Sequence, residues 1–485
     1  MLLSRLVAII GLGIALYSLL FHGLTDVAFL SADEPRYAAI GRDMAATGDW
    51  ITPRLNGQPW FEKPPLLYWL TAASWTVGLR DELAARLPVA LLSAAFLIFF
   101  FFRLRRDFGH APALASASIL ATSIGWIAFS HVAVTDLPLA VFFSAAMLLA
   151  LPAPPGAAER PPPLATGVLL GLAMLAKGLV PVVLCLPALY FCRRHWRRLL
   201  AIAALAIAVF LPWFLAATAQ HGAEPFRELI LKHHLSRFFG GDIHHERPVW
   251  FYVPILLGGL LPWTPALVCL RPRAGVGHAW TDPRLQYLAA WAIFGSLFFS
   301  ASTNKLPGYL LPVLPPIAAL VGIRSHESLA HNRPLRLAIA AMLPLLVLGA
   351  QVLPDALTDG LTRAPLQPRN IALMAASAAG AFVSPPYTVA ALALWAKLTV
   401  YPVIDAHLGA RRLWNEIKPR AADTCIEWIG RDWRYGLDYY AQPPLPDCAT
   451  EQRPLALTGE NGVRPSVRPS GSSAPDGPHT SPLPE

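Results

Sequence analysis

The sequence is short of charged residues. Only 14% of its 485 residues are Asp, Glu, Lys or Arg, whereas a soluble globular domain carries about 25%. At the same time, 55% of the residues are hydrophobic and the mean hydropathy is +0.46. This composition argues against a soluble globular protein.

The few charges leave long uncharged stretches in the sequence. These matter because crossing a bilayer takes roughly 20 apolar residues. Stretches free of Asp, Glu, Lys and Arg cover 87–102, 111–135, 137–158, 199–220, 248–270, 285–304, 337–354 and 370–396. They predict an all-α polytopic membrane protein. The first apolar run, 6–21, lacks a small-x-small cleavage site before His22 and precedes many further spans, so we interpret it as a retained helix.

Cysteine is scarce as well. Cys185, Cys192 and Cys269 lie in apolar runs, where we expect them to be inert packing residues. Cys425 and Cys448 lie in the polar C-terminal part. They can pair if that part faces an oxidising compartment.

The positive charges mark one side of the membrane. The formal net charge is +9, but the arginines gather in clusters between apolar stretches, at 103–106, 193–198, 271–273 and 324–336. Cytoplasmic loops collect Lys and Arg, so this distribution indicates topology and not nucleic-acid binding. With these clusters inside, the parts that lie outside are 24–82, the turns at Asp136 and Lys177, 221–247 and 302–309. The loop 24–82 agrees, because it holds eight acidic residues against five basic ones.

Prolines and composition divide the rest of the chain. Pro385 and Pro386 interrupt the stretch 370–396, and the residue before a proline resists helix. We therefore predict two short spans there and about 13 in total. This count puts the segment after Tyr401 outside; a single helix in 370–396 would put it inside.

Three regions result. Residues 1–401 are predicted to form the transmembrane domain, in which 22–83 is the first outer loop with helices beside the membrane. Residues 402–458 turn polar and aromatic, which predicts a small soluble domain. Ser, Pro and Gly dominate 459–485, which predicts disorder.

Polar residues close to apolar spans all fall on the outer side of this topology. They are Asp33, Glu34, Glu62, Lys63, Asp136, Lys177, His233, His234, Arg237, His244, His245 and Lys305. The arginines alone fixed the orientation, so this clustering independently indicates one polar site at the outer membrane boundary.

The residue types suggest the chemistry of that site. Positive side chains suited to phosphate binding are Lys63, Arg237 and Lys305. Asp33 and Asp136 are candidates for a general base that deprotonates an acceptor. Glu62 together with one or two of the histidines offers the oxygen and nitrogen ligands of a divalent metal such as zinc, although no spacing is specific for metal.

Each of these residues also has a purely structural interpretation. Asp33 can cap a helix whose apolar positions are Tyr37, Ile40 and Met44. Glu62 with Lys63 can be an interfacial ion pair, Asp136 can end a helix, and the histidines can be solvated loop residues. Lys177 and Lys305 can extend their ammonium groups to the interface.

Ordered motifs give the most specific indication. The chain contains "SADEPRYAAIGRDMAATGDWITPRLNGQPWFEKPPLLYWLTA" and then, in order, "VTDLPL", "LAKGLVP", "HLSRF", "PVWFYVPILLGGLLPW" and "NKLPGYLLPVLPP". Over residues 1–325 it resembles the ArnT-like lipid-carrier glycosyltransferases. These are aminoarabinose transferases acting on lipid A, which have the GT-C fold and are related to the protein O-mannosyltransferases.

The resemblance implies a multi-pass enzyme of the bacterial inner membrane. It implies transfer of a sugar, such as 4-amino-4-deoxy-L-arabinose, from undecaprenyl phosphate or another polyprenyl phosphate to lipid A or a related glycolipid on the periplasmic side. The alternative is transfer to Ser or Thr of proteins. A lipid or solute transporter is disfavoured, because the charged motifs lie at one boundary and no repeat relates the two halves.

The matching motifs also imply roles for individual residues. Asp33 and Asp136 resemble the catalytic aspartates, and Glu34 beside Asp33 is a third catalytic candidate. The donor phosphate is expected to bind to Lys63, Arg237, Lys305 and Tyr309. Glu62 with His234 or His245 resembles a metal site, zinc being the expected ion. Because "KHHLSRF" offers two adjacent histidines, the choice of histidine stays open.

Overall fold

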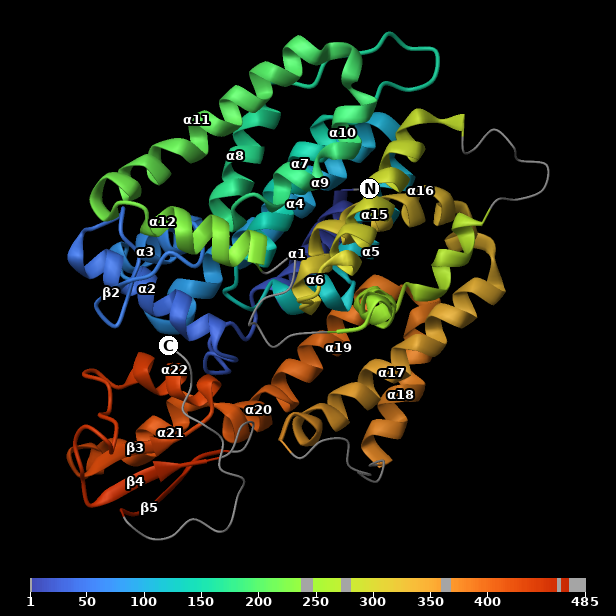
Figure 1. Cartoon of the computed structure of the whole chain (residues 1–485). Coiled ribbons are helices and arrows are strands. Elements are labelled where there is room, and N and C mark those ends of the chain that lie inside the picture. The colour runs from blue at the N-terminus through green and yellow to red at the C-terminus, as the bar shows by residue number, and fades with distance from the viewer. Residues whose placement is uncertain (1, 237–246, 272–280, 359–367, 460–463, 471–485) are drawn as a thin grey trace.

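The computed structural model describes residues 2–236, 247–271, 281–358, 368–459 and 464–470. Figure 1 shows a helical bundle with a small domain of helices and strands against one end. The helices of the bundle are α1 (Leu2–Leu20), α4 (Asp81–Phe108), α5 (His110–Ala121), α6 (Ile124–Phe129), α7 (Asp136–Leu149), α8 (Ala165–Lys177), α9 (Val180–Leu184), α10 (Leu186–Phe191), η1 (Arg193–His195), α11 (Trp196–His221), α12 (Glu224–Phe226), η2 (Arg227–Ser236), η3 (Val249–Phe251), α14 (Tyr252–Gly259), η4 (Thr264–Leu270), α15 (Pro283–Ala301), η6 (Pro307–Val313), α16 (Leu314–His331), α17 (Arg333–Thr358), α18 (Pro368–Val383), α19 (Pro385–Thr399) and α20 (Tyr401–Leu408).

Several of these helices present apolar surface that no other described part of the protein covers. Within the described residues, five are long and apolar enough to cross a membrane, and the bent pair Val249–Gly259 and Thr264–Leu270 makes a sixth if it is one span. In Arg193–His221, only 22% of the most apolar window is buried inside the protein. An uncovered apolar surface of this extent suits lipid. The chain is therefore a multi-pass membrane protein.

The predicted number of about 13 spans is not confirmed, because breaks divide the apolar stretches into shorter helices. The stretch 111–135 holds α5 and α6, which separate at Thr122 and Ser123. Two predicted breaks are confirmed. Helix α8 ends at Lys177, and α18 and α19 are separate helices on either side of Ser384.

Glycines allow α8 and α11 to approach closely. Gly167 and Gly171 are four residues apart on one face of α8, and a Cβ atom on Gly171 would lie 2.5 Å from Cβ of Val209. A Cβ atom on Gly167 would lie 2.5 Å from the carbonyl oxygen of Ile202. This small-xxx-small spacing is typical of packing between membrane helices, where close backbone contact replaces the hydrophobic driving force.

The first outer loop folds into two helices and a hairpin. They are α2 (Asp33–Thr47), α3 (Leu66–Thr76), and the antiparallel strands β1 (Arg54–Leu55) and β2 (Gln58–Pro59). Tyr37, Ile40 and Met44 are buried on one face of α2, which confirms the predicted helical spacing. Gly41 lets α2 pack on α3, because a Cβ atom there would lie 2.6 Å from Cβ of Thr71.

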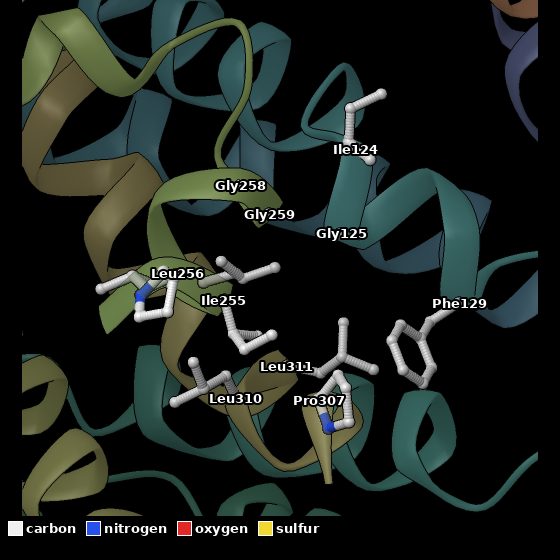
Figure 2. A pocket seen from close by; sticks show the side chains of 12 residues that line it. Ile124, Gly125, Phe129, Ile255, Leu256, Gly258, Gly259, Pro307, Leu310 and Leu311 are labelled. Atoms are coloured by element: carbon white, nitrogen blue, oxygen red, sulfur yellow. The ribbon is translucent and has the colours of Figure 1, made fainter. Parts of the chain in front are cut away.

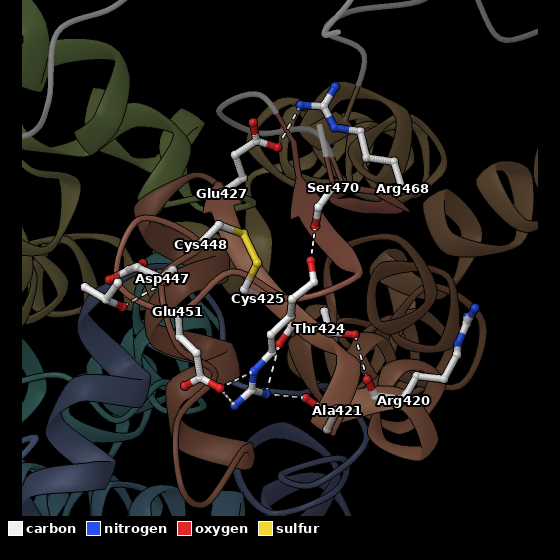
Figure 3. Close-up of a disulfide and its surroundings, with 12 residues drawn as sticks. Arg420, Ala421, Thr424, Cys425, Glu427, Asp447, Cys448, Glu451, Arg468 and Ser470 are labelled. Carbon is white, nitrogen blue, oxygen red and sulfur yellow. Dashed lines mark hydrogen bonds and ion pairs between the residues drawn. A yellow bond between two sulfur atoms is a disulfide. The ribbon is translucent and has the colours of Figure 1, made fainter. Parts of the chain in front are cut away.

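The C-terminal domain has its own hydrophobic core. It contains α21 (Ala410–Ile417), η7 (Lys418–Asp423), β3 (Thr424–Trp428), α22 (Arg431–Tyr440), β4 (Leu455–Thr458) and β5 (Ser466–Pro469). Strand β4 pairs parallel with β3 and antiparallel with β5. Cys425 and Cys448 form a disulfide, the pairing that the sequence left conditional (Figure 3). The prediction of disorder from 459 onward is wrong for β5, which closes this sheet.

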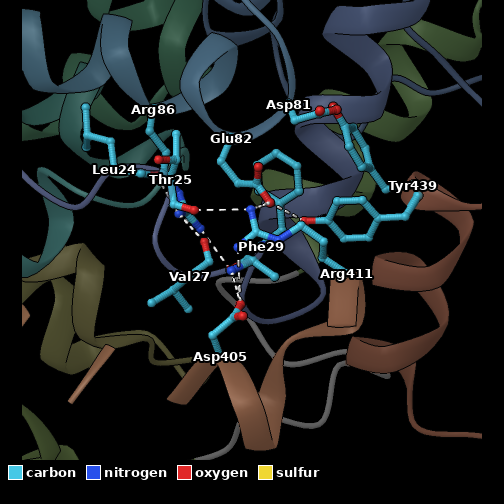
Figure 4. A network of polar contacts seen from close by, with 12 residues as sticks. Leu24, Thr25, Val27, Phe29, Asp81, Glu82, Arg86, Asp405, Arg411 and Tyr439 are labelled. Atoms are coloured by element: carbon cyan, nitrogen blue, oxygen red, sulfur yellow. Dashed lines mark hydrogen bonds and ion pairs between the residues drawn. The ribbon is translucent and has the colours of Figure 1, made fainter. Parts of the chain in front are cut away.

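Ion pairs join this domain to the start of α4, as Figure 4 shows. Arg411 contacts Glu82 at 3.2 Å and Asp405 at 3.4 Å. The hydroxyl of Tyr439 donates to Asp81 at 3.2 Å, and the hydroxyl of Tyr440 donates to Glu82. The domain is thereby held beside the first outer loop.

Candidate functional site

The first turn of α2 carries a buried arginine between two acids. Asp33 is the first residue of α2, and the i, i+3 spacing places Arg36 beside it. The guanidinium of Arg36 pairs with Asp33 and, at 3.0 Å, with Glu62. The side chain of Arg36 is 5% exposed and that of Asp33 is 40% exposed. The residue before α2 is Ala32, which forms no side-chain cap, and the carboxylate of Asp33 is partly exposed.

Glu62 and Lys63 extend this cluster. Nζ of Lys63 lies 2.9 Å from Oε1 of Glu62, and both side chains are largely buried. Two prolines follow Lys63 and lead into α3. The Glu62–Lys63 pair therefore lies between the hairpin and an apolar helix. A buried ammonium and a buried carboxylate need each other's charge. The position of the Lys63 ammonium is thus fixed by Glu62.

The geometry does not favour the predicted catalytic role of Glu34. Its carboxylate is fully buried and accepts from Nε of Arg86 at 2.7 Å and from its Nη2 at 2.8 Å. The backbone N–H groups of Leu30 and Ala133 also donate to it, each at 2.9 Å. Four donors occupy a carboxylate with four lone-pair sites. Glu34 therefore acts in holding the structure together.

A second polar cluster surrounds Asp136 at the start of α7. Nζ of Lys177 lies 2.6 Å from Oδ1 of Asp136, and the same ammonium stands 4.3 Å from the ring centroid of Tyr309. Gly308 allows this approach, because a Cβ atom there would lie 2.7 Å from Oδ1 of Asp136. The three motifs "VTDLPL", "LAKGLVP" and "NKLPGY" thus meet in space, as the topology predicted.

Glu34 links the two clusters. It follows Asp33 in the sequence, and it accepts from the N–H of Ala133, three residues before Asp136. Arg86 is the common anchor, since it also donates to the carbonyl groups of Leu24, Val27 and Ala28. The starts of α2 and α7 are therefore fixed against each other, which brings both predicted aspartates to one end of the bundle.

Lys305 lies in the loop before η6 and is buried. Its ammonium donates to the carbonyl oxygen of Arg247 at 3.0 Å and to that of Ser302. Burial lowers the pKa of Lys305. Because its ammonium donates to backbone carbonyls, Lys305 stabilises the loop that leads to Tyr309. This arrangement does not favour the predicted role of Lys305 in phosphate binding.

Three predicted residues lie wholly or partly outside the described structure. Arg237 and His245 fall within 237–246, outside the described residues. His234 belongs to the π-helix η2. Among described residues there is no group of three or more His, Cys, Asp or Glu that could hold a metal ion. Glu62 does not fit such an ion either, because its oxygens face Arg36 and Lys63.

An apolar cavity borders the second cluster. Its volume is about 250 Å³, and it is lined mainly by residues of α6, α14 and η6 (Figure 2). Gly125 and Gly259 bring α6 and α14 together, since a Cβ atom on Gly125 would lie 3.2 Å from Cα of Gly259. Phe129 joins the cavity to the polar cluster, because it lines the cavity and also packs against Gly308 beside Asp136.

The sequence analysis missed several residues that build this site. Arg36 had a signal, because its spacing from Asp33 is that of neighbours on a helix. Arg86 interrupts an apolar helix, which by itself marks a residue with a buried partner. Lys177 was placed on the same side as Asp136, but its partner was not predicted. Tyr435 of α22, whose ring lies 5.0 Å from Cζ of Arg36, had no local signal.

The sequence is similar to those of known proteins. Residues 5–224 match the family of dolichyl-phosphate-mannose-protein mannosyltransferases. The undecaprenyl phosphate-alpha-4-amino-4-deoxy-L-arabinose arabinosyl transferase of Pseudomonas paraeruginosa is 34% identical over 316 residues, which cover 61% of this chain and 57% of that protein. Its namesake from Edwardsiella ictaluri is 34% identical over 306 residues, 60% of this chain and 54% of the relative. The chain thus matches little more than half the length of these curated relatives.

Solved structures extend the likeness to nearly the whole chain. The crystal structure of ArnT from Cupriavidus metallidurans bound to undecaprenyl phosphate has a TM-score of 0.71 and 22% identity, and it covers 97% of this chain and 99% of that one. The apo crystal structure of the same protein has a TM-score of 0.72 and 23% identity, covering 94% and 93%. At this identity the likeness establishes the fold, which is the predicted GT-C fold.

Proposed function

We propose, from the premise that this is an ArnT-like chain of the GT-C fold, that it transfers a sugar from a polyprenyl phosphate to a lipid-borne acceptor. The observation that carries the proposal is the apolar cavity whose lining residue Phe129 packs against Gly308, beside the cluster of Asp136, Lys177 and Tyr309. An isoprenoid phosphate is apolar along its chain and anionic at its head, so it needs both surfaces side by side.

The residues divide the chemistry between them. Transfer at the anomeric carbon requires removal of a proton from the acceptor hydroxyl and neutralisation of the phosphate that leaves. Asp33 suits the first task, because its partly exposed carboxylate can accept a proton from an incoming hydroxyl. Lys63 and Lys177, with the hydroxyl of Tyr309 as a donor, suit the second, because the charge of the leaving phosphate grows as the glycosidic bond breaks.

Asp136 then takes a supporting role. Its carboxylate holds the ammonium of Lys177 over Tyr309. The ammonium is thereby kept in place for the phosphate of the donor. Arg237 would join this clamp according to its motif. Lys305 supports the position of Tyr309 indirectly, because its ammonium donates to a backbone carbonyl.

The donor follows the curated relatives, whose name specifies undecaprenyl phosphate and 4-amino-4-deoxy-L-arabinose. We propose this donor, and lipid A or a related glycolipid as acceptor. Transfer to Ser or Thr of proteins is the second candidate, which the match of residues 5–224 to the protein mannosyltransferase family favours.

The proposed location is the bacterial inner membrane, with the site and the C-terminal domain on the periplasmic side. The disulfide Cys425–Cys448 supports this side, because such bonds persist in the oxidising periplasm and are rare in the cytosol. About 13 spans, starting from a cytoplasmic N-terminus, would also place the C-terminal domain on the periplasmic side. The zinc ion, with Glu62 and either His234 or His245 as ligands, stays a prediction, in which Glu62 would have to exchange its partners Arg36 and Lys63 for the ion.

The experiment is transfer by the purified protein in detergent, with undecaprenyl-phosphate-linked aminoarabinose and lipid A, followed by mass spectrometry of the lipid. A mass increase of one aminoarabinose unit on lipid A is expected with the wild-type chain. Lys63→Ala should lose the transfer while the protein still purifies as a monodisperse species. Unmodified lipid A beside a newly glycosylated protein would favour the second candidate.

A further inference from the structure

The C-terminal domain reaches the candidate site through α22. The ring of Tyr435 lies 5.0 Å from Cζ of Arg36, and Trp60 of the first loop lies 5.5 Å from the same atom. Arg36 in turn pairs with Asp33 and Glu62. Tyr435 is therefore one wall of the pocket that holds the guanidinium, although its domain lies at the far end of the sequence.

Asp432 makes a second contact at the same place. Its carboxylate faces the backbone of Ala32, the residue before α2. Partial desolvation beside α2 raises the pKa of Asp432, and the neighbouring carboxylate of Asp33 raises it further, against the opposing charges of Arg431 and Arg36. This contact brings the start of α22 close to Asp33.

These residues share one face of α22. Asp432, Tyr435 and Tyr439 follow the i, i+3, i+7 spacing of a helix face, and Arg42 of α2 stands 4.1 Å from the ring of Tyr439 and donates to its carbonyl oxygen at 2.9 Å. Gly436 turns to the other side, where a Cβ atom would lie 2.5 Å from Cβ of Ala410 in α21. One face of α22 thus belongs to its own domain and the other to α2.

We propose that α22 is part of the transferase site, with Tyr435 and Asp432 as positioning residues for Asp33. Tyr435 confines the guanidinium of Arg36, which holds the Asp33 carboxylate from the side. Asp432 lies against the backbone at the start of α2 and so fixes the segment that carries Asp33. The inference rests on the proposed function, in which Asp33 receives the acceptor proton.

The test combines steady-state kinetics with hydrogen exchange of the full-length protein in detergent. Tyr435→Leu removes the aromatic face and should lower kcat about tenfold, in line with a desolvated cation–π contact, with the KM for the donor changed less than about twofold. Tyr435→Phe retains the ring and should keep the wild-type kcat. Trp428→Leu, at an exposed aromatic of β3 in the same domain, is the matched control and should change nothing.

Asp432 gives a second pair of variants that does not endanger folding, because its side chain is at the surface. Asp432→Ala removes the carboxylate that faces the backbone of Ala32 and should lower kcat, whereas Asp432→Asn keeps a side-chain oxygen there and should restore it. Mass spectrometry of the exchange at residues 28–40 should show faster exchange of the Ala32 amide in Asp432→Ala and near wild-type exchange in Asp432→Asn and Trp428→Leu.

The outcomes separate this inference from the proposed function. Wild-type kcat in both Tyr435→Leu and Asp432→Ala, or an equal loss of kcat in Trp428→Leu, would overturn the inference while leaving the transferase intact. Unchanged exchange at Ala32 in Asp432→Ala would overturn it as well, whatever the activity. If the wild-type protein transfers no sugar but the exchange responds as expected, the proposed function fails and the contact between α22 and α2 stands.

Discussion

Asp33 and Glu34 are adjacent acids with opposite surroundings, and replacing each one separately should give opposite results. Glu34 is fully buried, and its four donors are the two nitrogens of Arg86 and two backbone N–H groups. Glu34→Ala would leave the guanidinium of Arg86 buried without its counter-charge. Breaking a buried pair in this way costs about 3–5 kcal/mol of unfolding free energy.

Asp33→Asn should have a much smaller effect on stability. The side chain of Asp33 is 40% exposed, and Arg36 keeps Glu62 as a partner at 3.0 Å. Exposed ion pairs contribute at most about 1 kcal/mol. If the Asp33 carboxylate accepts the acceptor proton, the amide cannot replace it, and transfer should fall by at least about a hundredfold, the typical contribution of a general base.

Thermal unfolding in detergent, followed by tryptophan fluorescence, measures the first effect, and transfer at a temperature well below both transitions measures the second. The expected result is a marked drop in unfolding temperature for Glu34→Ala alone and a loss of transfer without that drop for Asp33→Asn. The reasoning is refuted if Glu34→Ala unfolds at the wild-type temperature yet is inactive, because Glu34 would then belong to the chemistry.

Three further predictions follow from the second cluster and the C-terminal domain. Gly308→Ala should lower transfer strongly, because the new methyl group would lie 2.7 Å from Oδ1 of Asp136; wild-type kinetics would show that the cluster rearranges freely. Lys177→Met and Asp136→Asn should each impair transfer, and a double-mutant cycle should give a coupling of about 0.5–3 kcal/mol, whereas additive losses would deny the pair a joint role. Cys425→Ser with Cys448→Ser should destabilise the C-terminal domain by about 3 kcal/mol, detectable as faster proteolysis there, and reductant should have the same effect on the wild-type chain but none on the variant.

The sequence by itself determined the features that depend on local composition and spacing. The charge deficit required a membrane environment, the helical spacing of Tyr37, Ile40 and Met44 appears as the buried face of α2, and Pro385 separates α18 from α19. The arginine clusters oriented the chain, and this orientation brought Asp136, Lys177 and Tyr309 to one side before their contact was known. Such features follow from the solvation of single segments, so they can be read one segment at a time.

Only the tertiary structure decided which charged groups are partners. Glu34 and Asp33 look alike in the sequence, but Arg86 from α4 makes the first a buried anchor and leaves the second accessible. The contact of Tyr435 with Arg36 joins segments from opposite ends of the chain. The environment of a charge depends on what is folded against it, and pairing over such distances leaves no pattern in the local sequence.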